Sequence, residues 1–287
     1  MKIKLKNLVI FFVALFVIIP VFALAHQPRI TDQKDTIVTD PEISKAYYGK
    51  LAGEPQVYTI NATESFNLYV NILVPDIKDQ KTDLYVLIIK DGEMDKPFAF
   101  LDGVKYEWKK FFEPFGHDSY LMGPEYKAHV EAGKYDIYVW NTNNDSKYSL
   151  AIGEKEIFGI KETINAVNLI PKIKKEFFNK SPIDFILSPI GFGYIIVMYI
   201  LAFIVGFLYR LIMKKFAKKS IQRVTKNINK KDRLIRATLG AVLLILAITT
   251  SWNVILLFLS GFCFFEAIFS WCGIYAAIGK NTCPSEV

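Results

Sequence analysis

The stretch NKKDRLIRATLGAVLLILAITTSWNVILLFLSGFCFFEAIFSWCGIYAAIGKNTC (229–283) decides how the rest of the chain is interpreted. It begins with basic residues, passes through two apolar runs (234–251 and 252–271), and ends in a segment that contains two cysteines. Apolar runs of this length are typical of short membrane helices. The joint between them is so short that only a tight helical hairpin fits. We therefore predict a two-helix transmembrane hairpin over residues 234–283.

The positive charge of the chain is concentrated beside apolar segments. The 287 residues carry a net charge of +7 and have a mean hydropathy of +0.25. Residues 26–185 contain 20 Lys and Arg against 25 Asp and Glu, whereas residues 210–236 contain 11 Lys and Arg against one acid, Asp232. Nucleic-acid-binding domains carry a basic face on a globular surface, so this distribution argues against a nucleic-acid partner. It indicates contact with membrane lipids.

A further apolar segment without charges extends over residues 186–209, which is long enough to cross a bilayer. Five basic residues follow it: Arg210, Lys214, Lys215, Lys218 and Lys219. Because such clusters stay in the cytoplasm, this span runs from outside to inside. Residues 210–233 are then a basic cytoplasmic segment, predicted as a helix on the anionic inner leaflet. We predict a multi-pass protein of the plasma or inner membrane, with residues 26–185 outside and the C-terminus in the cytoplasm.

Residues 1–25 have the features of an export segment. Three lysines precede an apolar run (8–22), and the segment ends in Ala-Leu-Ala, which matches a small-residue cleavage pattern. The segment is either a secretory signal cleaved after Ala25 or an uncleaved N-terminal anchor. Both interpretations place the chain from residue 26 onward outside the cytoplasm.

The exported part has the pattern of a β-sandwich. After a polar lead-in (26–43), segments rich in Tyr, Val, Ile and Phe show a period near two and are separated by turn residues. In FNLYVNILV (66–74), the alternate residues from Phe66 to Ile72 are apolar and fall on one face, as in a core strand. We predict an all-β antiparallel sandwich or jelly roll over residues 26–153. It contains no cysteine, so a hydrophobic core rather than disulfides must stabilise it.

The strands EAGKYDIYVWN (131–141) and KYSLAIG (147–153) are joined by a polar Asn/Asp turn. This pair resembles the last hairpin of bacterial pre-peptidase C-terminal type domains, and the resemblance covers roughly residues 44–153. It implies a sandwich that binds a ligand without catalysis, similar to carbohydrate-binding and adhesion domains. The partner that it implies is a glycan or an envelope protein, and it implies no cofactor.

One segment between strands, FFEPFGHDSYLMGPEY (111–126), is predicted as a long aromatic loop. Long loops on a rigid scaffold often bind ligands. Four of its residues are candidates for lining a ligand site: His117, Asp118, Tyr120 and Glu125. Alternatively, the loop packs its aromatic residues on the sandwich and uses His117 and Asp118 for turn hydrogen bonds. One histidine with scattered carboxylates lacks metal-ligand spacing, so we assign no metal, and a weak calcium site stays open as an alternative.

Residues 154–185 change to a period of three to four residues, which is typical of an amphipathic helix. Apolar residues recur from Ile160 to Phe177, with lysines between them. Two interpretations remain open. The helix is a stalk that lies on the outer membrane interface, or it packs on the sandwich.

The C-terminal stretch contains paired motifs at its entry and exit. The entry residues are Asp232, Arg233, Arg236 and Gly240, and the exit residues are Cys272, Tyr275, Gly279, Asn281, Thr282 and Cys283. These motifs resemble those of the YgaP-like inner-membrane transmembrane domain family over residues 229–283. The chain departs from the family pattern at Gly273, where proline is frequent, and this loosens the turn after Cys272. The resemblance implies a two-helix membrane module and no settled activity.

The module offers two features for chemistry. If residues 274–278 fold back along the interface, the thiols of Cys272 and Cys283 approach each other and can act as a redox pair, share a metal or pass a persulfide. Otherwise they are inert small residues at a helix end. Glu266 is the only carboxylate within a predicted span. It pairs with a basic residue, lies protonated against another protomer, or reaches the cytoplasmic surface.

Two basic residues and two glycines of the hairpin suggest further contacts. Arg233 and Arg236 can extend to lipid phosphates or pair with Asp232. Gly240 and Gly261 permit close helix contact, which includes contact between copies in a homo-oligomer.

Two functions follow from these features. The first is a non-enzymatic cell-envelope protein that displays a binding or sensing sandwich outside the cytoplasm on a membrane anchor. The second is a membrane module that performs thiol or sulfur redox chemistry in the cytoplasm at Cys272 and Cys283. A soluble hydrolase is disfavoured, because no nucleophile elbow, His-Glu-x-x-His or phosphate-loop motif occurs in the sequence.

Overall fold

The structure is a computed structural model that describes residues 26–217 and 224–283. The predicted export segment (1–25) lies outside the described residues, as do Lys218 and Lys219. The described chain divides into a β-rich unit that ends at Ile190 and a helical unit that begins at Gly191.

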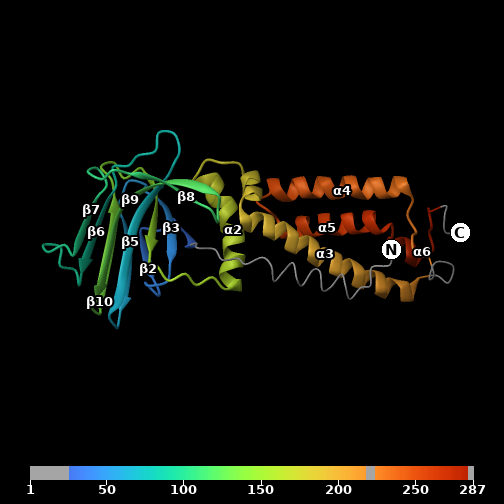
Figure 1. Cartoon of the computed structure of the whole chain (residues 1–287), viewed down its shortest axis with the longest axis horizontal. Helices are drawn as coiled ribbons and strands as arrows, with labels where there is room; N and C mark the ends of the chain where they lie inside the picture. The colour runs from blue at the N-terminus through green and yellow to red at the C-terminus, as the bar shows by residue number, and fades with distance from the viewer. Residues whose placement is uncertain (1–25, 218–223, 284–287) are drawn as a thin grey trace. The chain divides into compact units, whose positions relative to one another are not determined.

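The β-rich unit consists of two sheets (Figure 1). The first has the strand order β1-β3-β11-β5-β9-β8, and the second has the order β2-β4-β10-β6-β7. The strands are β1 (Gln27–Thr31), β2 (Asp35–Val38), β3 (Lys45–Lys50), β4 (Gln56–Ala62), β5 (Phe66–Pro75), β6 (Tyr85–Lys90), β7 (Ala99–Asp102), β8 (Lys109–Glu113), β9 (Asp118–Val130), β10 (Gly133–Trp140) and β11 (Lys147–Ile152). The predicted sandwich architecture is thereby confirmed.

The strand directions differ in part from the antiparallel expectation. β1 pairs with β3 and β2 pairs with β4 in parallel, whereas the other pairs are antiparallel. Both parallel edge strands come from the polar segment 26–43, which we expected to be a lead-in. Edge strands are exposed on one side and therefore need less apolar sequence than central ones, so their composition did not reveal them.

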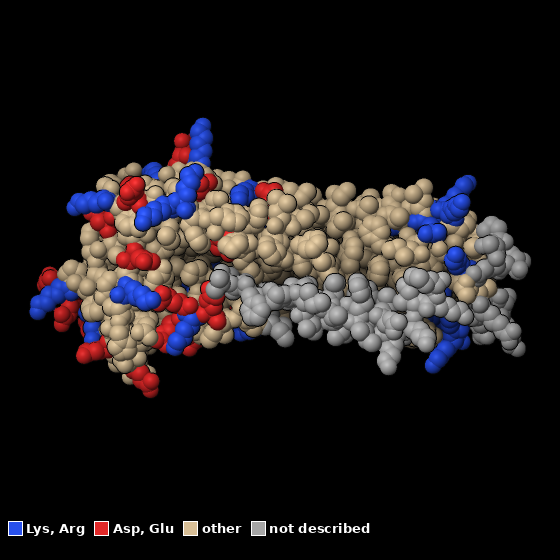
Figure 2. Space-filling model, in the orientation of Figure 1, with Lys and Arg blue, Asp and Glu red and all other residues tan. Residues whose placement is uncertain are grey.

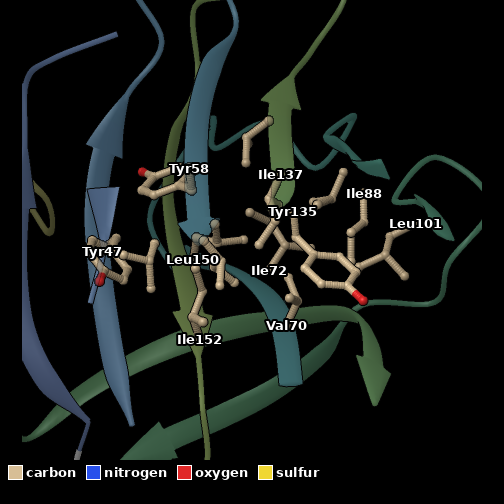
Figure 3. Packing of buried hydrophobic residues seen from close by; sticks show 14 of the residues in the cluster. Tyr47, Tyr58, Val70, Ile72, Ile88, Leu101, Tyr135, Ile137, Leu150 and Ile152 are labelled. Carbon is tan, nitrogen blue, oxygen red and sulfur yellow. The ribbon is translucent and has the colours of Figure 1, made fainter. Parts of the chain in front are cut away.

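The core lies between the two sheets (Figure 3). The predicted inward positions of β5 are buried, with Leu68, Val70 and Ile72 at 0% exposure. Ile137 from β10 and Leu150 from β11 belong to the same cluster. Full burial of one such side chain contributes about 1.5–3 kcal/mol to stability. A core of this kind explains how the sandwich folds without disulfides.

Helix α2 (Ile160–Glu176) packs on the sandwich, which is one of the two interpretations that the sequence left open. Ile173 and the following Phe177 and Phe178 form a buried cluster with Leu73 and Tyr120 of the first sheet. The apolar stripe of the helix thus covers sheet residues. A short 3-10 helix, η1 (Pro182–Leu187), follows it.

The helical unit contains α3 (Pro189–Phe216), α4 (Lys230–Thr249), α5 (Val254–Phe269) and α6 (Gly273–Ile278). α4 and α5 are joined by four residues (250–253), and the Asn253 side chain accepts hydrogen bonds from the first backbone N–H groups of α5. The tight helical hairpin expected from the sequence is therefore present. Its helices begin and end within a few residues of the predicted spans.

Small residues bring the three long helices close together. The α carbon of Gly240 lies against the ring of Phe264, and Gly261 lies against Ala202 and Tyr199 of α3. The Ser260 hydroxyl donates to the Gly240 carbonyl at 2.8 Å. Both glycines that we expected to permit close helix contact make such contacts within the chain.

The surface of these helices is apolar. Helix α3 is, by length and composition, the one helix in the described ranges that can cross a membrane, with a mean hydropathy of 2.5, and α5 is a shorter apolar helix. Large apolar side chains are exposed along all three, including Phe192, Leu208, Leu234, Ile245 and Ile255. Exposed apolar surface of this extent is unfavourable in water and favourable in lipid.

The basic residues after the first span extend the helix rather than starting a new one. α3 continues to Phe216, so Arg210, Lys214 and Lys215 lie in its last turns. On the visible face of the helical unit, basic side chains gather at one end, beyond an uncharged surface (Figure 2). Residues 224–229 are not helical, so the predicted inner-leaflet helix is absent there. Asn227 and Asn229 of this segment instead form the hydrogen bonds described below.

Candidate functional site

The predicted ligand loop (111–126) is largely β-structure, with β8 and β9 joined by a short turn. Asp118 and Tyr120 lie on the same side of β9, and Tyr120 shares a hydroxyl–hydroxyl hydrogen bond of 2.7 Å with Tyr48. His117 is in the turn at a φ of 60°, with its ring against Phe112. Glu125 is separate and accepts a hydrogen bond from Tyr69 at 2.9 Å. Asp118 and Tyr120 line the same cavity, whereas His117 and Glu125 do not, so the four candidate residues do not form one site.

Asp118 belongs to a buried ion cluster that the sequence did not reveal. Lys174 of α2 is 0% exposed, and its ammonium lies 2.8 Å from the Asp118 carboxylate and 2.6 Å from the Gly116 carbonyl oxygen. Lys180 contacts the other carboxylate oxygen, also at 2.8 Å. The position of Lys174 within the apolar stripe of α2 is the one sequence feature that indicates its burial, but the sequence alone does not identify Asp118 as its partner. The cluster attaches α2 to the sandwich.

Asp118 and Gly116 of this cluster also line a cavity of about 50 Å³. Its polar lining includes Tyr48, Glu113 and Tyr120. Burial raises the pKa of Glu113, although its carboxylate accepts hydrogen bonds from the backbone N–H groups of Phe115 and Gly116. Burial also raises the pKa of the tyrosine hydroxyls. A space of this size holds a few water molecules, so we assign it a structural role.

A second polar cluster joins the two ends of the hairpin. The side-chain amide of Asn227 accepts a hydrogen bond from the backbone N–H of Cys272 at 2.7 Å and donates one to the Cys272 carbonyl at 2.8 Å. Its own carbonyl accepts the N–H of Thr282 at 3.1 Å. The Thr282 hydroxyl contacts Asp232, whose N–H is capped by Asn229 at 2.8 Å. We call these five residues, Asn227, Asn229, Asp232, Cys272 and Thr282, the hairpin latch.

Arg233, Arg236 and Glu266 lie beside the latch. Glu266 pairs with Arg236 at 2.8 Å, and both side chains are largely buried. Of the three possibilities given for Glu266, pairing with a basic residue is the one observed within the chain. The guanidinium of Arg236 also lies 5.1 Å from the Tyr275 ring centroid and beside the Cys272 thiol. Arg233 donates to the Ala267 carbonyl at 2.8 Å.

The two cysteines of the exit motif are buried, with Cys272 at 2% and Cys283 at 9% exposure. The segment between them forms α6. Asn227 accepts hydrogen bonds from the backbone N–H groups of both Cys272 and Thr282, and Thr282 directly precedes Cys283. Gly273, where the chain departs from the family pattern, lies against Tyr209. A β carbon there would lie 2.4 Å from the Tyr209 ring, so a proline would require that ring to move.

A third feature lies on the outer face of the second sheet. Tyr85 of β6, Phe100 of β7 and Trp140 of β10 form one group of rings, which we call the aromatic triad. Their centroids are 5.9 Å (Tyr85–Phe100), 5.5 Å (Tyr85–Trp140) and 6.2 Å (Phe100–Trp140) apart. Phe100 is 51% exposed. The residues are far apart in sequence, so only strand register could have revealed the group.

The triad is flanked by polar residues. Asn141, next to Trp140, donates to Asp83 at 3.0 Å. Asp102, at the end of β7, accepts hydrogen bonds from the backbone N–H groups that follow it. Leu87, whose register partners are Tyr138 and Phe100, continues the partly exposed surface along β6. The outer face of this sheet thus combines an apolar centre with hydrogen-bonding groups at its edge.

Fold and polar clusters together define a membrane protein with an N-terminal β-sandwich and a C-terminal helical hairpin. Residues 224–286 match the model of the family "Inner membrane protein YgaP-like, transmembrane domain". The resemblance expected for the C-terminal stretch is therefore confirmed, and the hairpin is a membrane domain.

Two further comparisons concern the whole chain. The pre-peptidase C-terminal domain of a collagenase from Bacillus anthracis is similar at 16% sequence identity and a TM-score of 0.28, over 42% of this chain and 97% of that one. No curated protein matches the chain.

Proposed function

We propose that the protein is a membrane-anchored binding protein of the cell envelope, whose sandwich engages a ligand outside the cytoplasm. The observation that carries the proposal is the outer face of the second sheet, where Phe100 is 51% exposed and apolar side chains of the two neighbouring strands are partly exposed. Exposed apolar residues on adjacent strands lower solubility unless they serve an interaction. The first sheet, in contrast, is packed against α2.

The proposed orientation rests on the distribution of charge. The sandwich is acidic overall, whereas basic residues gather at the end of α3 and the start of α4. Lys and Arg beside membrane helices remain in the cytoplasm. If α4 and α5 cross the bilayer together with α3, the hairpin tip and the sandwich lie outside, and the latch lies inside.

Two experiments test this proposal. A reporter inserted at residue 222 should be active only in the cytoplasm, and activity outside would contradict the orientation. For binding, the full chain in lipid nanodiscs should bind isolated cell-envelope material. Leu87→Asp, which places a charge in the middle of the sheet face, should weaken that binding at least tenfold. Ile157→Asp is the matched control, because Ile157 is 53% exposed outside the strands, and it should leave binding unchanged.

A second candidate function is thiol chemistry in the hairpin. The observation in its favour is the guanidinium of Arg236 beside the Cys272 thiol, because a nearby cation stabilises a thiolate. The burial of Cys272 opposes it, since burial disfavours the charged form. A stabilised thiolate should react with iodoacetamide near neutral pH, and Arg236→Met should slow that reaction. Slow alkylation that Arg236→Met does not change would exclude this function.

A further inference from the structure

We propose that the aromatic triad, Tyr85, Phe100 and Trp140, is a binding site for an uncharged saccharide chain. The inference rests on the proposed function and names its ligand class. The reasoning has three steps, which concern the arrangement of the rings, their position on the sheet and the charges around them.

The three rings are offset from one another and do not form a single column. The interplanar angles are 14° for Tyr85 and Phe100, 26° for Tyr85 and Trp140, and 38° for Phe100 and Trp140. In a pile of three parallel rings, the outer two are separated by twice the spacing of neighbours. Here the three centroid distances are nearly equal, so the centroids form a triangle in which Tyr85 stacks with an offset against both Phe100 and Trp140. Phe100 is 51% exposed and the other two rings are partly exposed, so the group presents an apolar surface to solvent.

Strand register holds the rings in this arrangement. Trp140 and Tyr85 are direct cross-strand partners, and Phe100 is paired with Leu87, two residues along from Tyr85. The intervening residues Val86 and Ile88 point inward and are 0% exposed. Because a buried face fixes the register, the rings need little reorganisation when a ligand binds. A pre-organised site of this kind retains more of its interaction free energy as affinity.

Phe100 lies on an edge strand, where exposed aromatic residues are unusual. β7 is the last strand of its sheet and is four residues long. Natural edge strands commonly carry charges or proline that prevent association with other chains. A half-exposed phenylalanine at this position therefore indicates a ligand.

The chemistry of the surface matches a saccharide. One face of a sugar ring presents C–H groups with a partial positive charge, which are attracted to the negative face of an aromatic ring. The hydroxyl groups at its rim hydrogen-bond to carboxylates, which Asp83 and Asp102 provide beside the rings, whereas Asn141 is 1% exposed and already bonded within the chain. Because Asp102 is paired with Lys105 at 3.4 Å, Asp83 is the acid that disfavours an anionic chain through like-charge repulsion. Three rings also cover much less area than the roughly 1,000 Å² of a stable protein interface.

The test uses the full chain in phosphatidylcholine nanodiscs, because maltoside detergents would themselves present sugar. The probes are the neutral hexaoses of glucose, mannose and N-acetylglucosamine, and calorimetry measures the dissociation constant. At least one hexaose should bind, and Trp140→Ala and Phe100→Ala should each weaken its binding at least tenfold. Phe112→Ala is the matched control, since Phe112 is 50% exposed on the other sheet, and it should change binding less than twofold. Amide hydrogen exchange of β6 and β10 verifies that each variant is folded.

Two results would overturn the inference. One is the absence of binding to every hexaose, and the other is binding that the triad substitutions do not weaken. If envelope material still binds in a manner sensitive to Leu87→Asp, the proposed function stands and only the ligand class is wrong, for example because a protein or a second copy occupies the face. If neither hexaoses nor envelope material bind, both proposals fail.

Discussion

Removal of the Asp118 carboxylate is expected to detach α2 from the sandwich. In Asp118→Ala, the Lys174 ammonium remains at 0% exposure and keeps only the Gly116 carbonyl oxygen as a partner, at 2.6 Å. A buried charge that loses its counter-ion costs about 3–5 kcal/mol. Lys180 is 36% exposed and can turn into solvent, so its lost ion pair adds about 1 kcal/mol or less.

The two lysines should therefore respond differently to substitution. Lys180→Met removes a partly exposed partner and should cost about 1 kcal/mol or less. Lys174→Met leaves Asp118 paired with Lys180, so its cost should be smaller than that of Asp118→Ala. The double variant Asp118→Ala/Lys174→Met contains no uncompensated charge and should recover most of the loss, because replacing both members of a buried pair is often nearly neutral.

Hydrogen exchange of the full chain in nanodiscs measures these differences locally. At about 1.4 kcal/mol per factor of ten, Asp118→Ala should lower protection of α2 amides by roughly two to three and a half powers of ten, up to the limit set by global unfolding. Peptides from α5 serve as an internal reference and should not change. Equal losses in Asp118→Ala and Lys180→Met, or no recovery in the double variant, would refute the role of the buried pair.

Three further predictions concern other parts of the chain. Glu266→Gln should lower the free energy of unfolding of the helical unit by about 2 kcal/mol in an SDS titration, and Arg236→Met/Glu266→Leu should recover it; a cost that persists in the double variant would contradict this. Because the pKa of Glu113 is raised by burial above its usual 4.5, the folded state holds its proton more tightly, so stability should fall as pH rises from about 4.5. Glu113→Gln should remove that fall in a series of thermal midpoints, and an unchanged pH profile would show that burial of Glu113 does not matter. Gly273→Ala should destabilise α6 by about 1–3 kcal/mol through overlap with the Tyr209 ring. Hydrogen exchange of the α6 amides should become faster accordingly, and the added substitution Tyr209→Ala should partly reverse that increase.

Periodicity predicted the elements whose environment is regular. Alternation along β5 identified the inward face of a core strand, and the apolar runs identified α4 and α5. Both signals arise because burial in a core or in lipid applies to every second residue or to a whole segment. The edge strands β1 and β2 were missed for the converse reason, since exposure on one side leaves little pattern.

Long-range contacts account for the parts of the sites that the sequence could not supply. The paired motifs indicated that the entry and exit of the hairpin matter, but not that Asn227 joins them or that Arg236 is the partner of Glu266. Glycine and proline in the segment 111–126 suggested a loop, whereas pairing with β5 and β8 makes most of it a strand. In that case tertiary hydrogen bonds override the local preference.

The sequence by itself determined that this protein has a β-sandwich, an apolar span and a membrane hairpin, because composition and period report burial residue by residue. Only the tertiary structure decided which side chains meet. Lys174 and Asp118 are 56 residues apart, and the aromatic triad comes from three strands whose register is set by the core beneath them. Charge pairing and ring contacts depend on distance in space. A pattern along the sequence does not report the distance between residues that lie far apart in the chain and meet only after folding.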